Sequence, residues 1–244
     1  MKVLLLCMVM LYQMPNAFGQ SRTFHLPKAH FNDTINYWYK AAKKREQKVG
    51  LNAVENSSYP FHFRLSFTGG KIIDLWQQDN KFSGTFTIWV IDADEALKSV
   101  ERIYSQQYKF EPKQAADIGQ LVISSGIIQL PSEENIAGWQ QGLDGEEIVM
   151  QYSDSKAYYF KSYWTPSAQH GLPEALLIQS FCSAVFEVAS IKLVRESFTA
   201  GIPFQCYATD GSTATCKTVR STAEYWQYKR DVNRFLRQNK KKIN

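Results

Sequence analysis

Alternation of apolar and polar residues is the clearest pattern in the chain, and it begins at Phe61. From Phe61 to Phe67 every second residue is apolar, which is typical of a strand that buries one face and exposes the other. Short polar turns separate this segment from two further apolar runs, and such short connections predict an antiparallel meander. A hairpin of two more strands is expected around the polar turn at residues 153–156. The strands that the pattern predicts are 61–67, 71–77, 82–91, 146–152 and 157–164.

Helical periodicity fills most of the sequence between these strands. A cap at Asn32 or Asp33 predicts the first helix, and Asp92 is expected to cap the second. Between Ala175 and Ile191 the chain is apolar nearly all round, which is typical of a helix that is covered on most sides. We therefore expect one long central helix there. The helices that the pattern predicts are 34–48, 93–107, a segment from Pro112, a segment from Ser132, 173–198 and 221–239.

Strands that cluster in hairpins, with helices between them and no alternating strand–helix series, define the α+β class. The expected fold is an antiparallel sheet built from the meander and hairpins, packed against the long central apolar helix and several amphipathic helices. A single domain over residues 20–244, ending in a basic helix, is the simplest organisation. The alternative is a domain boundary near Glu111-Pro112, where few residues belong to a regular element.

Residues 1–19 have the pattern of a signal peptide. Lys2 is followed by an apolar run over residues 3–12, and the small residues Ala17 and Gly19 provide a cleavage site before Gln20. The run has roughly ten residues, whereas a helix that spans a bilayer needs about twenty. A retained membrane anchor is the alternative interpretation. We expect export to the periplasm or the medium, with no transmembrane span after the signal peptide is removed.

The positive charge of the chain is concentrated at its C-terminus. The net charge is +5, yet seven basic residues and one acidic residue follow position 228. A nucleic-acid-binding protein would need a basic face spread over the fold, so we expect no nucleic-acid partner. The terminal cations have two interpretations: contact with anionic lipid, lipopolysaccharide or an acidic partner, or a solvated helix end whose cations suit the helix dipole. These basic residues are Lys229, Arg230, Arg234, Arg237, Lys240, Lys241 and Lys242.

Export makes a disulfide bond the expected state of two of the cysteines. Cys206 and Cys216 bracket Asp210-Gly211, a dipeptide typical of a hairpin turn, so they face each other across the predicted ladder. Closing so short a loop stabilises a fold by about 2–3 kcal/mol. Cys7 lies inside the signal peptide and is expected to leave with it. Cys182 lies in an apolar stretch, where a buried, inert thiol is expected.

No established catalytic or nucleotide-binding motif occurs in the sequence, and we expect neither a cofactor nor a metal ion. His62 lies on the polar face of a predicted strand, where a structural or solvent-facing role is expected. His170 lies in a loop, where functional residues concentrate, but a catalytic base needs a partner and an orienting group. A hydrolase site that combines His170 with Asp144 or Asp154 is the alternative hypothesis.

Aromatic residues gather around the predicted hairpin at residues 146–164. Trp139 precedes the Asp144-Gly145 turn, and Tyr163 and Trp164 end the second strand. An exposed aromatic surface of this kind could stack on a sugar ring or a peptide, with Asp144 accepting a hydroxyl hydrogen bond. The alternative is that the same aromatics pack into the core and form cross-strand pairs.

The segment from Trp139 to Pro166, with its tryptophan, Asp-Gly turn, aromatic hairpin and closing Tyr-Trp-x-Pro, resembles uncharacterised exported proteins of Bacteroidota. The resemblance covers this segment only, and it implies export without implying an activity. Asn32 and Asn56 begin glycosylation sequons, which apply only in a eukaryotic source. We expect an exported, non-catalytic protein that binds a partner protein or a small ligand. The expected binding residues are Trp139, Asp144, Tyr163 and Trp164.

Overall fold

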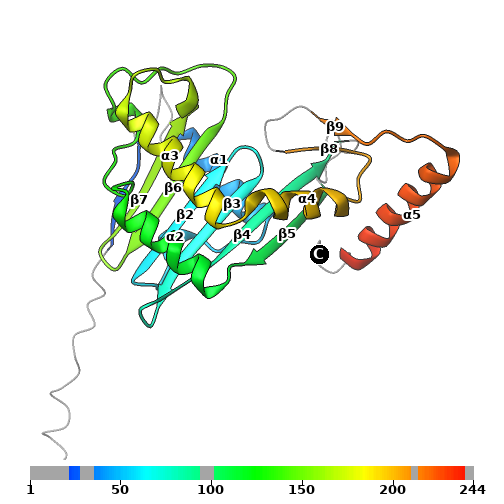
Figure 1. Cartoon of the computed structure of the whole chain (residues 1–244), viewed down its shortest axis with the longest axis horizontal. Coiled ribbons are helices and arrows are strands. Elements are labelled where there is room, and N and C mark those ends of the chain that lie inside the picture. The colour runs from blue at the N-terminus through cyan, green and yellow to red at the C-terminus, as the bar shows by residue number, and fades with distance from the viewer. Residues whose placement is uncertain (1–21, 28–35, 94–101, 210–213, 240–244) are drawn as a thin grey trace, which may run out of the picture.

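The computed structural model describes residues 22–27, 36–93, 102–209 and 214–239, so the expected signal peptide lies outside the described residues. The described residues form an α+β fold around one nine-stranded sheet in the order β1-β7-β6-β2-β3-β4-β8-β9, with β5 also paired to β4 (Figure 1). Every pairing is antiparallel except that of β1 with β7. The strands are β1 Thr23–His25, β2 Phe61–Phe67, β3 Lys71–Gln78, β4 Lys81–Asp92, β5 Ile103–Lys109, β6 Glu147–Asp154, β7 Ala157–Trp164, β8 Cys206–Ala208 and β9 Thr215–Cys216. The helices are α1 Tyr37–Lys48, α2 Pro112–Ser124, α3 Pro173–Val188, α4 Ile191–Gly201 and α5 Thr222–Asn239.

The predicted meander and hairpin are confirmed, with boundaries within two residues of those expected. β2, β3 and β4 form the meander, and β6 and β7 form the hairpin. The turn between β2 and β3 requires a glycine at position 70, because its φ is +71° and a Cβ there would lie 2.5 Å from the carbonyl oxygen of Trp89. In this register, residues equidistant from Gly69 face each other across β2 and β3.

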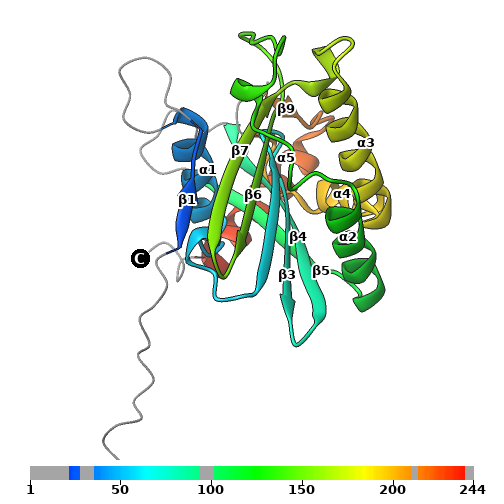
Figure 2. The same cartoon turned by 90° about the vertical axis from the view of Figure 1, so that its left-hand side faces the viewer.

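The sheet separates two layers of different chemistry. Figure 2 shows α2, α3 and α4 on one face and α1 on the other. The first face carries the main apolar core, in which the Phe63 ring packs edge-on against Phe181 of α3 at 5.9 Å and Phe67 packs on Phe186 at 4.9 Å. A smaller apolar cluster on the second face includes Ala42 of α1.

The second face of β2 is buried as well. All residues of β2 are buried, including the polar His62, Arg64 and Ser66. The expectation that this strand exposes its polar face was wrong, because α1 and the segment 50–59 cover that side of the sheet. The alternating pattern therefore separates an apolar core from a buried polar layer.

Residues 103–109 form strand β5, whereas the sequence pattern predicts a helix over residues 93–107. The predicted helix was wrong in this region, because Ile103 to Lys109 pair with the long strand β4 along its whole central part. Tyr104, Gln106 and Tyr108 alternate toward the core face, and the apolar spacing at Ile103 and Tyr104 fits a strand as well as a helix. The part of the predicted helix at residues 94–101 lies outside the described residues.

The expected long central helix was wrong, because residues 173–201 form two helices, α3 and α4, bent by 67°. Ser190 between them has a left-handed φ of 52°, which ends the first helix. α3 is not covered on most sides either, since Leu176 is 60% exposed and only the face that includes Phe181 is buried. Among the described residues no single helix is long and apolar enough to cross a bilayer, although α3 and α4 together pass by length and composition.

Two other helix starts differ from those expected. α1 begins at Tyr37 and is capped by Asn36, whose Oδ1 accepts from the backbone N–H of Trp38 at 2.9 Å; the predicted cap residues 32 and 33 lie outside the described residues. The helix expected from Ser132 is a single 3-10 turn, Glu133–Asn135. There the Ser132 hydroxyl and the Glu133 carboxylate accept hydrogen bonds from backbone N–H groups of β7. These bonds cover the edge of β7, so the segment follows that strand and does not continue as a helix.

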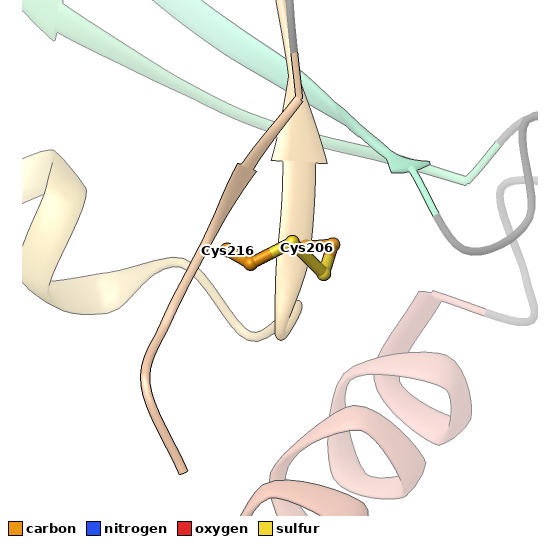
Figure 3. The surroundings of a disulfide bond; sticks show 2 residues. All are labelled: Cys206 and Cys216. Atoms are coloured by element: carbon orange, nitrogen blue, oxygen red, sulfur yellow. A yellow bond between two sulfur atoms is a disulfide. The ribbon is translucent and has the colours of Figure 1, made fainter.

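Cys206 and Cys216 lie opposite each other on β8 and β9 (Figure 3). Their sulfur atoms are 2.11 Å apart, which is compatible with the predicted disulfide bond. The predicted turn at residues 210–213 lies outside the described residues. Cys182 is buried as expected, and burial raises the pKa of its thiol to about 12.

Candidate functional site

The buried polar face of β2 and β3 carries a compact ion-pair network. Arg64 on β2 lies directly opposite Asp74 on β3. The Arg64 Nε donates to Asp74 Oδ1 and its Nη2 donates to Oδ2, both at 2.9 Å, which is the two-bond geometry of a strong arginine–carboxylate pair. Arg64 is fully buried. Burial alone would lower the pKa of its guanidinium, but Asp74 and Glu46 outweigh burial and raise it.

His62 is the second partner of Asp74. Its Nε2 lies 2.9 Å from Asp74 Oδ1. Burial alone would raise the pKa of the Asp74 carboxyl, but the His62 hydrogen bond and the Arg64 guanidinium hold it below its ordinary value. Asp74 is therefore ionised and accepts a hydrogen from Nε2. The buried Nδ1 of His62 has no hydrogen-bond partner among the described residues, and in a neutral imidazole it is an acceptor that lacks a donor.

α1 holds the other end of Arg64. Glu46 Oε1 lies 3.1 Å from Arg64 Nη1, and Lys43 Nζ donates to Glu46 Oε2 at 3.1 Å. The spacing of three residues places Lys43 and Glu46 on the same side of the helix. The buried residues of α1 are Ala42, Arg45 and Glu46, so ion pairs as well as apolar packing join this helix to the sheet.

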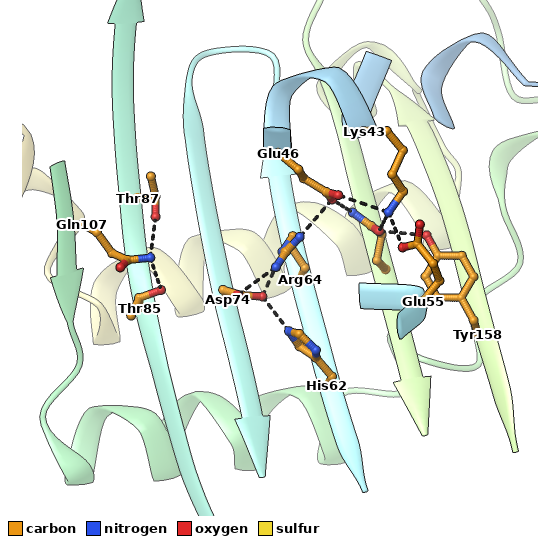
Figure 4. A network of polar contacts seen from close by, with 11 residues as sticks. Lys43, Glu46, Glu55, His62, Arg64, Asp74, Thr85, Thr87, Gln107 and Tyr158 are labelled. Carbon is orange, nitrogen blue, oxygen red and sulfur yellow. Dashed lines mark hydrogen bonds and ion pairs between the residues drawn. The ribbon is translucent and has the colours of Figure 1, made fainter. Parts of the chain in front are cut away.

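The network continues to β6 and β7. Lys43 Nζ donates to Gln151 Oε1 at 3.1 Å and also contacts the Glu55 carboxylate. The Tyr158 hydroxyl donates to Gln151 Oε1 at 2.8 Å, and Gln151 Nε2 donates to Glu46. Figure 4 shows these contacts as one connected set, in which each charged group lies beside a group of opposite charge. The charged residues, in order, are Asp74, Arg64, Glu46, Lys43 and Glu55.

A pocket of about 550 Å³ opens beside the network. The rings of Tyr59 and Trp76 line it and stack with centroids 5.8 Å apart and planes at 21°. Tyr59 also packs edge-on against His62 at 5.8 Å. Small-molecule sites have volumes of roughly 300–1,000 Å³, so this pocket is large enough for a ligand. The uncharged hydrogen-bonding side chains that line it are Asn52, Asn56, Ser57, Ser58, Thr85 and Gln107.

The chemistry of the lining favours an uncharged polar ligand with a flat face. Arg64 and Asp74 are the lysine, arginine, aspartate or glutamate residues that line the pocket, and they form an ion pair with each other. A His62–Asp74 pair can move a proton, but no serine, threonine or cysteine in the described part of the chain forms a hydrogen bond with His62. Within the described residues, the hydrogen bond of the His62 ring is therefore the one to Asp74.

A larger cavity of about 810 Å³ lies against β1 and β7 on the other face of the sheet. Lys161 lines it with 8% exposure and donates to the Ile128 carbonyl, and burial lowers the pKa of its amine to about 8. His25 stacks on Tyr159 with centroids 4.4 Å apart. The buried polar side chains of this cavity already have partners within the described ranges. It therefore lacks the unsatisfied group that marks the pocket beside His62.

The structure brings together three of the four residues expected to bind a ligand. Trp139 Nε1 donates to the Trp164 carbonyl at 3.2 Å, and its ring lies 5.8 Å from that of Tyr163. Tyr163 is fully buried, and a Cβ at Gly142 would overlap the Trp164 ring. Asp144 lies exposed in the loop before β6. These contacts give the aromatic residues a packing role, and a binding role for the hairpin stays a prediction.

His170 is exposed and forms no hydrogen bond or ion pair with any described residue. Asp154 ends β6, where its Oδ1 accepts the backbone N–H groups of Lys156 at 2.7 Å and Ala157 at 2.8 Å. Asp144 precedes the other end of the same strand. The alternative hydrolase site thus stays a prediction, without a contact between its proposed members.

The sequence pattern did not mark Arg64 or Asp74 as a candidate site residue. Each lies in a segment where a charged residue is expected to face solvent. A signal was nevertheless present, because the turn at Thr68-Gly69-Gly70 sets a register that pairs position 64 with position 74. Opposite charges at directly paired positions indicate a cross-strand ion pair.

Among the described residues, no three histidine, cysteine, aspartate or glutamate side chains are grouped as metal ligands. Comparison of the sequence with protein-family models gave no match, and comparison with curated proteins gave none either.

Proposed function

We propose that this chain is an exported, non-catalytic binding protein that holds a small neutral carbohydrate in the pocket beside His62. The observation that carries the proposal is a lining that combines two aromatic rings, Tyr59 and Trp76, with His62 and several uncharged hydrogen-bonding side chains. A sugar ring presents apolar C–H groups on its faces and hydroxyls at its edge. Its face would stack on an aromatic ring, and its hydroxyls would form hydrogen bonds with the amide and hydroxyl groups of the lining.

The neutral balance of the pocket supports an uncharged ligand. Arg64 and Asp74 already satisfy each other through two hydrogen bonds. A charged ligand would lose its hydration in the pocket and would meet no unpaired charge of opposite sign there. This loss of hydration costs several kcal/mol for a buried ion. A neutral polyhydroxyl molecule meets no such penalty.

The network also fixes the pocket before a ligand arrives. Asp74 orients His62, and Glu46 and Asp74 together hold both sides of the Arg64 guanidinium. The segment around residues 55–57, which lies at the wall of the pocket, is held in place as well. Arg22 donates hydrogen bonds to the backbone carbonyls of residues 55 and 57, both at 2.8 Å. Groups that are ordered in advance reduce the entropy lost on binding.

Export is part of the proposal. The signal-peptide pattern of residues 1–19 and the Cys206–Cys216 pair at disulfide distance both support a periplasmic or secreted protein. In such a location a binding protein meets free sugars and their polymers directly.

Isothermal titration calorimetry with glucose, galactose, mannose and N-acetylglucosamine tests the proposal, with glucuronate as the charged comparison. We expect at least one neutral sugar to bind and glucuronate to bind at least tenfold more weakly. Trp76→Leu, which keeps apolar volume but removes the ring, should weaken binding by about tenfold or more, the equivalent of about 1.4 kcal/mol. Tyr37→Ala, which removes an aromatic ring that is 65% exposed and outside the pocket, is the matched control.

Two outcomes would contradict the proposal. The first is the absence of heat with every neutral sugar, and the second is equal affinity in Trp76→Leu and the unchanged protein. Urea unfolding of each variant separates a lost contact from a lost fold, because a folded Trp76→Leu protein retains a single cooperative transition.

A further inference from the structure

The terminal helix α5 has one face that packs on the fold. Tyr228, Val232 and Phe235 follow the spacing of four and three residues that places side chains on one side of a helix. Val232 is buried, and the Phe235 ring lies 5.8 Å from that of Tyr104 and 5.6 Å from that of Phe204. The direction of this face is therefore set by contact with β5 and the segment before β8.

The opposite face of α5 combines an exposed tryptophan with cations. Trp226, Arg230 and Arg237 are spaced by four and seven residues, so they share one side of the helix, away from Val232. Trp226 is 57% exposed. Figure 1 shows α5 beyond β8 and β9, at the opposite end of the sheet from β1 and β7. Within the described part of the chain, Trp226, Arg230 and Arg237 are all exposed.

A solvated helix end explains cations in the last turn, but it does not explain a large exposed indole among them. Lysines and arginines alone suit bulk water and the C-terminal helix dipole. Trp226 lies in the second turn of α5 and has no such role. A tryptophan beside arginines is a combination found where a helix lies in a membrane interface, with the ring at the level of the lipid headgroups.

We propose that this face of α5 binds the surface of a membrane that contains anionic lipids, with Trp226 inserted between headgroups and Arg230 and Arg237 above lipid phosphates. The charge of the chain supports this partner. The net charge is +5, and the segment from Lys229 onward carries seven cations and one acid. The rest of the fold therefore contributes little attraction to an anionic surface, and the helix determines the orientation. The site is separate from the sugar pocket and does not depend on it.

Co-sedimentation with vesicles tests this surface. The probes are phosphatidylcholine vesicles and vesicles of phosphatidylcholine and phosphatidylglycerol at 3:1, each at low and at high salt. We expect binding to the anionic vesicles at low salt only. Arg230→Gln with Arg237→Gln should weaken it by roughly 25-fold, since one cation near such a surface contributes a factor of about five.

Matched variants distinguish binding through this face of α5 from a general effect of the protein's net charge. Lys113→Gln with Lys192→Gln removes the same charge from α2 and α4 and should leave vesicle binding within about twofold. Trp226→Ala should weaken binding and abolish the blue shift of tryptophan emission on adding anionic vesicles. All proteins share one N-terminus, so any contribution of the segment before residue 22 cancels. Trp226 is exposed, and an unchanged thermal transition shows that α5 is still docked.

Three results would overturn the proposal: equal binding to phosphatidylcholine alone, equal losses in the two double variants, or binding to soluble polyphosphate without binding to vesicles. The last result would assign the face to charge recognition without a membrane. Failure here leaves the sugar titration unaffected, because Trp226, Arg230 and Arg237 do not line the pocket.

Discussion

Glu147 on β6 is an acid whose surroundings oppose its charge. It is 1% exposed. Burial, followed by the negative charge of Glu133, raises the pKa of its carboxyl from about 4.5 to about 9. The Ser162 hydroxyl and the Arg45 guanidinium act in the opposite direction and are outweighed. Glu147 is therefore protonated in the folded protein at neutral pH.

This raised pKa makes stability fall as pH rises. In the unfolded chain the carboxyl ionises near pH 4.5, so between about pH 4.5 and 9 folding takes up one proton at Glu147. The free energy of unfolding then falls by about 1.4 kcal/mol per pH unit within that window. At pH 7 the accumulated penalty is about 3 kcal/mol. Glu147→Gln has nearly the same shape and cannot ionise, so it should raise the stability at pH 7 by up to about 3 kcal/mol.

Urea unfolding of both proteins at pH 5, 6, 7 and 8 measures the effect. The difference in free energy of unfolding should be below about 1 kcal/mol at pH 5 and should grow with each pH unit. Glu187→Gln, on the exposed side of α3, is the control and should give a difference that does not change with pH. If Glu147→Gln gives a difference that is flat from pH 5 to 8, Glu147 is ionised in the folded protein and the reasoning fails.

Two further substitutions test the buried charges. Asp74→Ala leaves the Arg64 guanidinium buried without its two-bond partner, so the free energy of unfolding in urea should fall by about 3–5 kcal/mol; a loss below about 1 kcal/mol would show that Arg64 reaches solvent easily. Burial lowers the pKa of Lys161 from 10.5 to about 8, so the unchanged protein carries a penalty that is full below pH 8 and disappears as pH rises toward 10.5. Lys161→Met should therefore be more stable by up to about 3 kcal/mol at pH 7, and a stability difference independent of pH between 7 and 10 would contradict this.

The meander could be predicted from sequence because its period is short and its turns are marked. From Phe61 to Phe67 the apolar residues alternate without interruption, and the Gly69-Gly70 turn supplies the positive φ that a tight connection needs. The sequence does not show what lies over the polar side of such a strand. The cover comes from α1, which approaches from a distant part of the chain and brings Glu46 against Arg64.

The helices were harder to predict because the local sequence pattern and the tertiary contacts favour different secondary structures. Ile103 and Tyr104 satisfy a helical stripe, but β4 continues past its hairpin and offers a free edge, so pairing along that edge decides the structure. The break between α3 and α4 has no sequence marker, because Ala189 and Ser190 include neither proline nor glycine. The break depends instead on how both helices pack against the twisted sheet, which the local sequence does not show.

The candidate site could not be assembled from sequence because its members are far apart along the chain. Lys43, Arg64 and Gln151 lie on three separate elements and meet only through the strand order β6-β2-β3 and the placement of α1. The Arg64–Asp74 pair is close in sequence, and the hairpin register identifies it. The aromatic hairpin, in contrast, was conspicuous in the sequence because aromatic residues that pack in a sheet cluster in the same way as those that bind a ligand.

Stability alone does not account for the polar layer. A buried ion pair is often no more stabilising than apolar residues of the same volume, because desolvation offsets the attraction between the charges. The other face of β2 shows that this chain builds an apolar layer readily, since Phe61, Phe63 and Leu65 are all buried there. What the charged layer provides is orientation: Arg64 fixes the Asp74 carboxylate, and Asp74 fixes the ring of His62 at the wall of the pocket. An ordered His62 ring is what the binding site proposed above requires at its wall, because groups that are fixed in advance lose less entropy on binding.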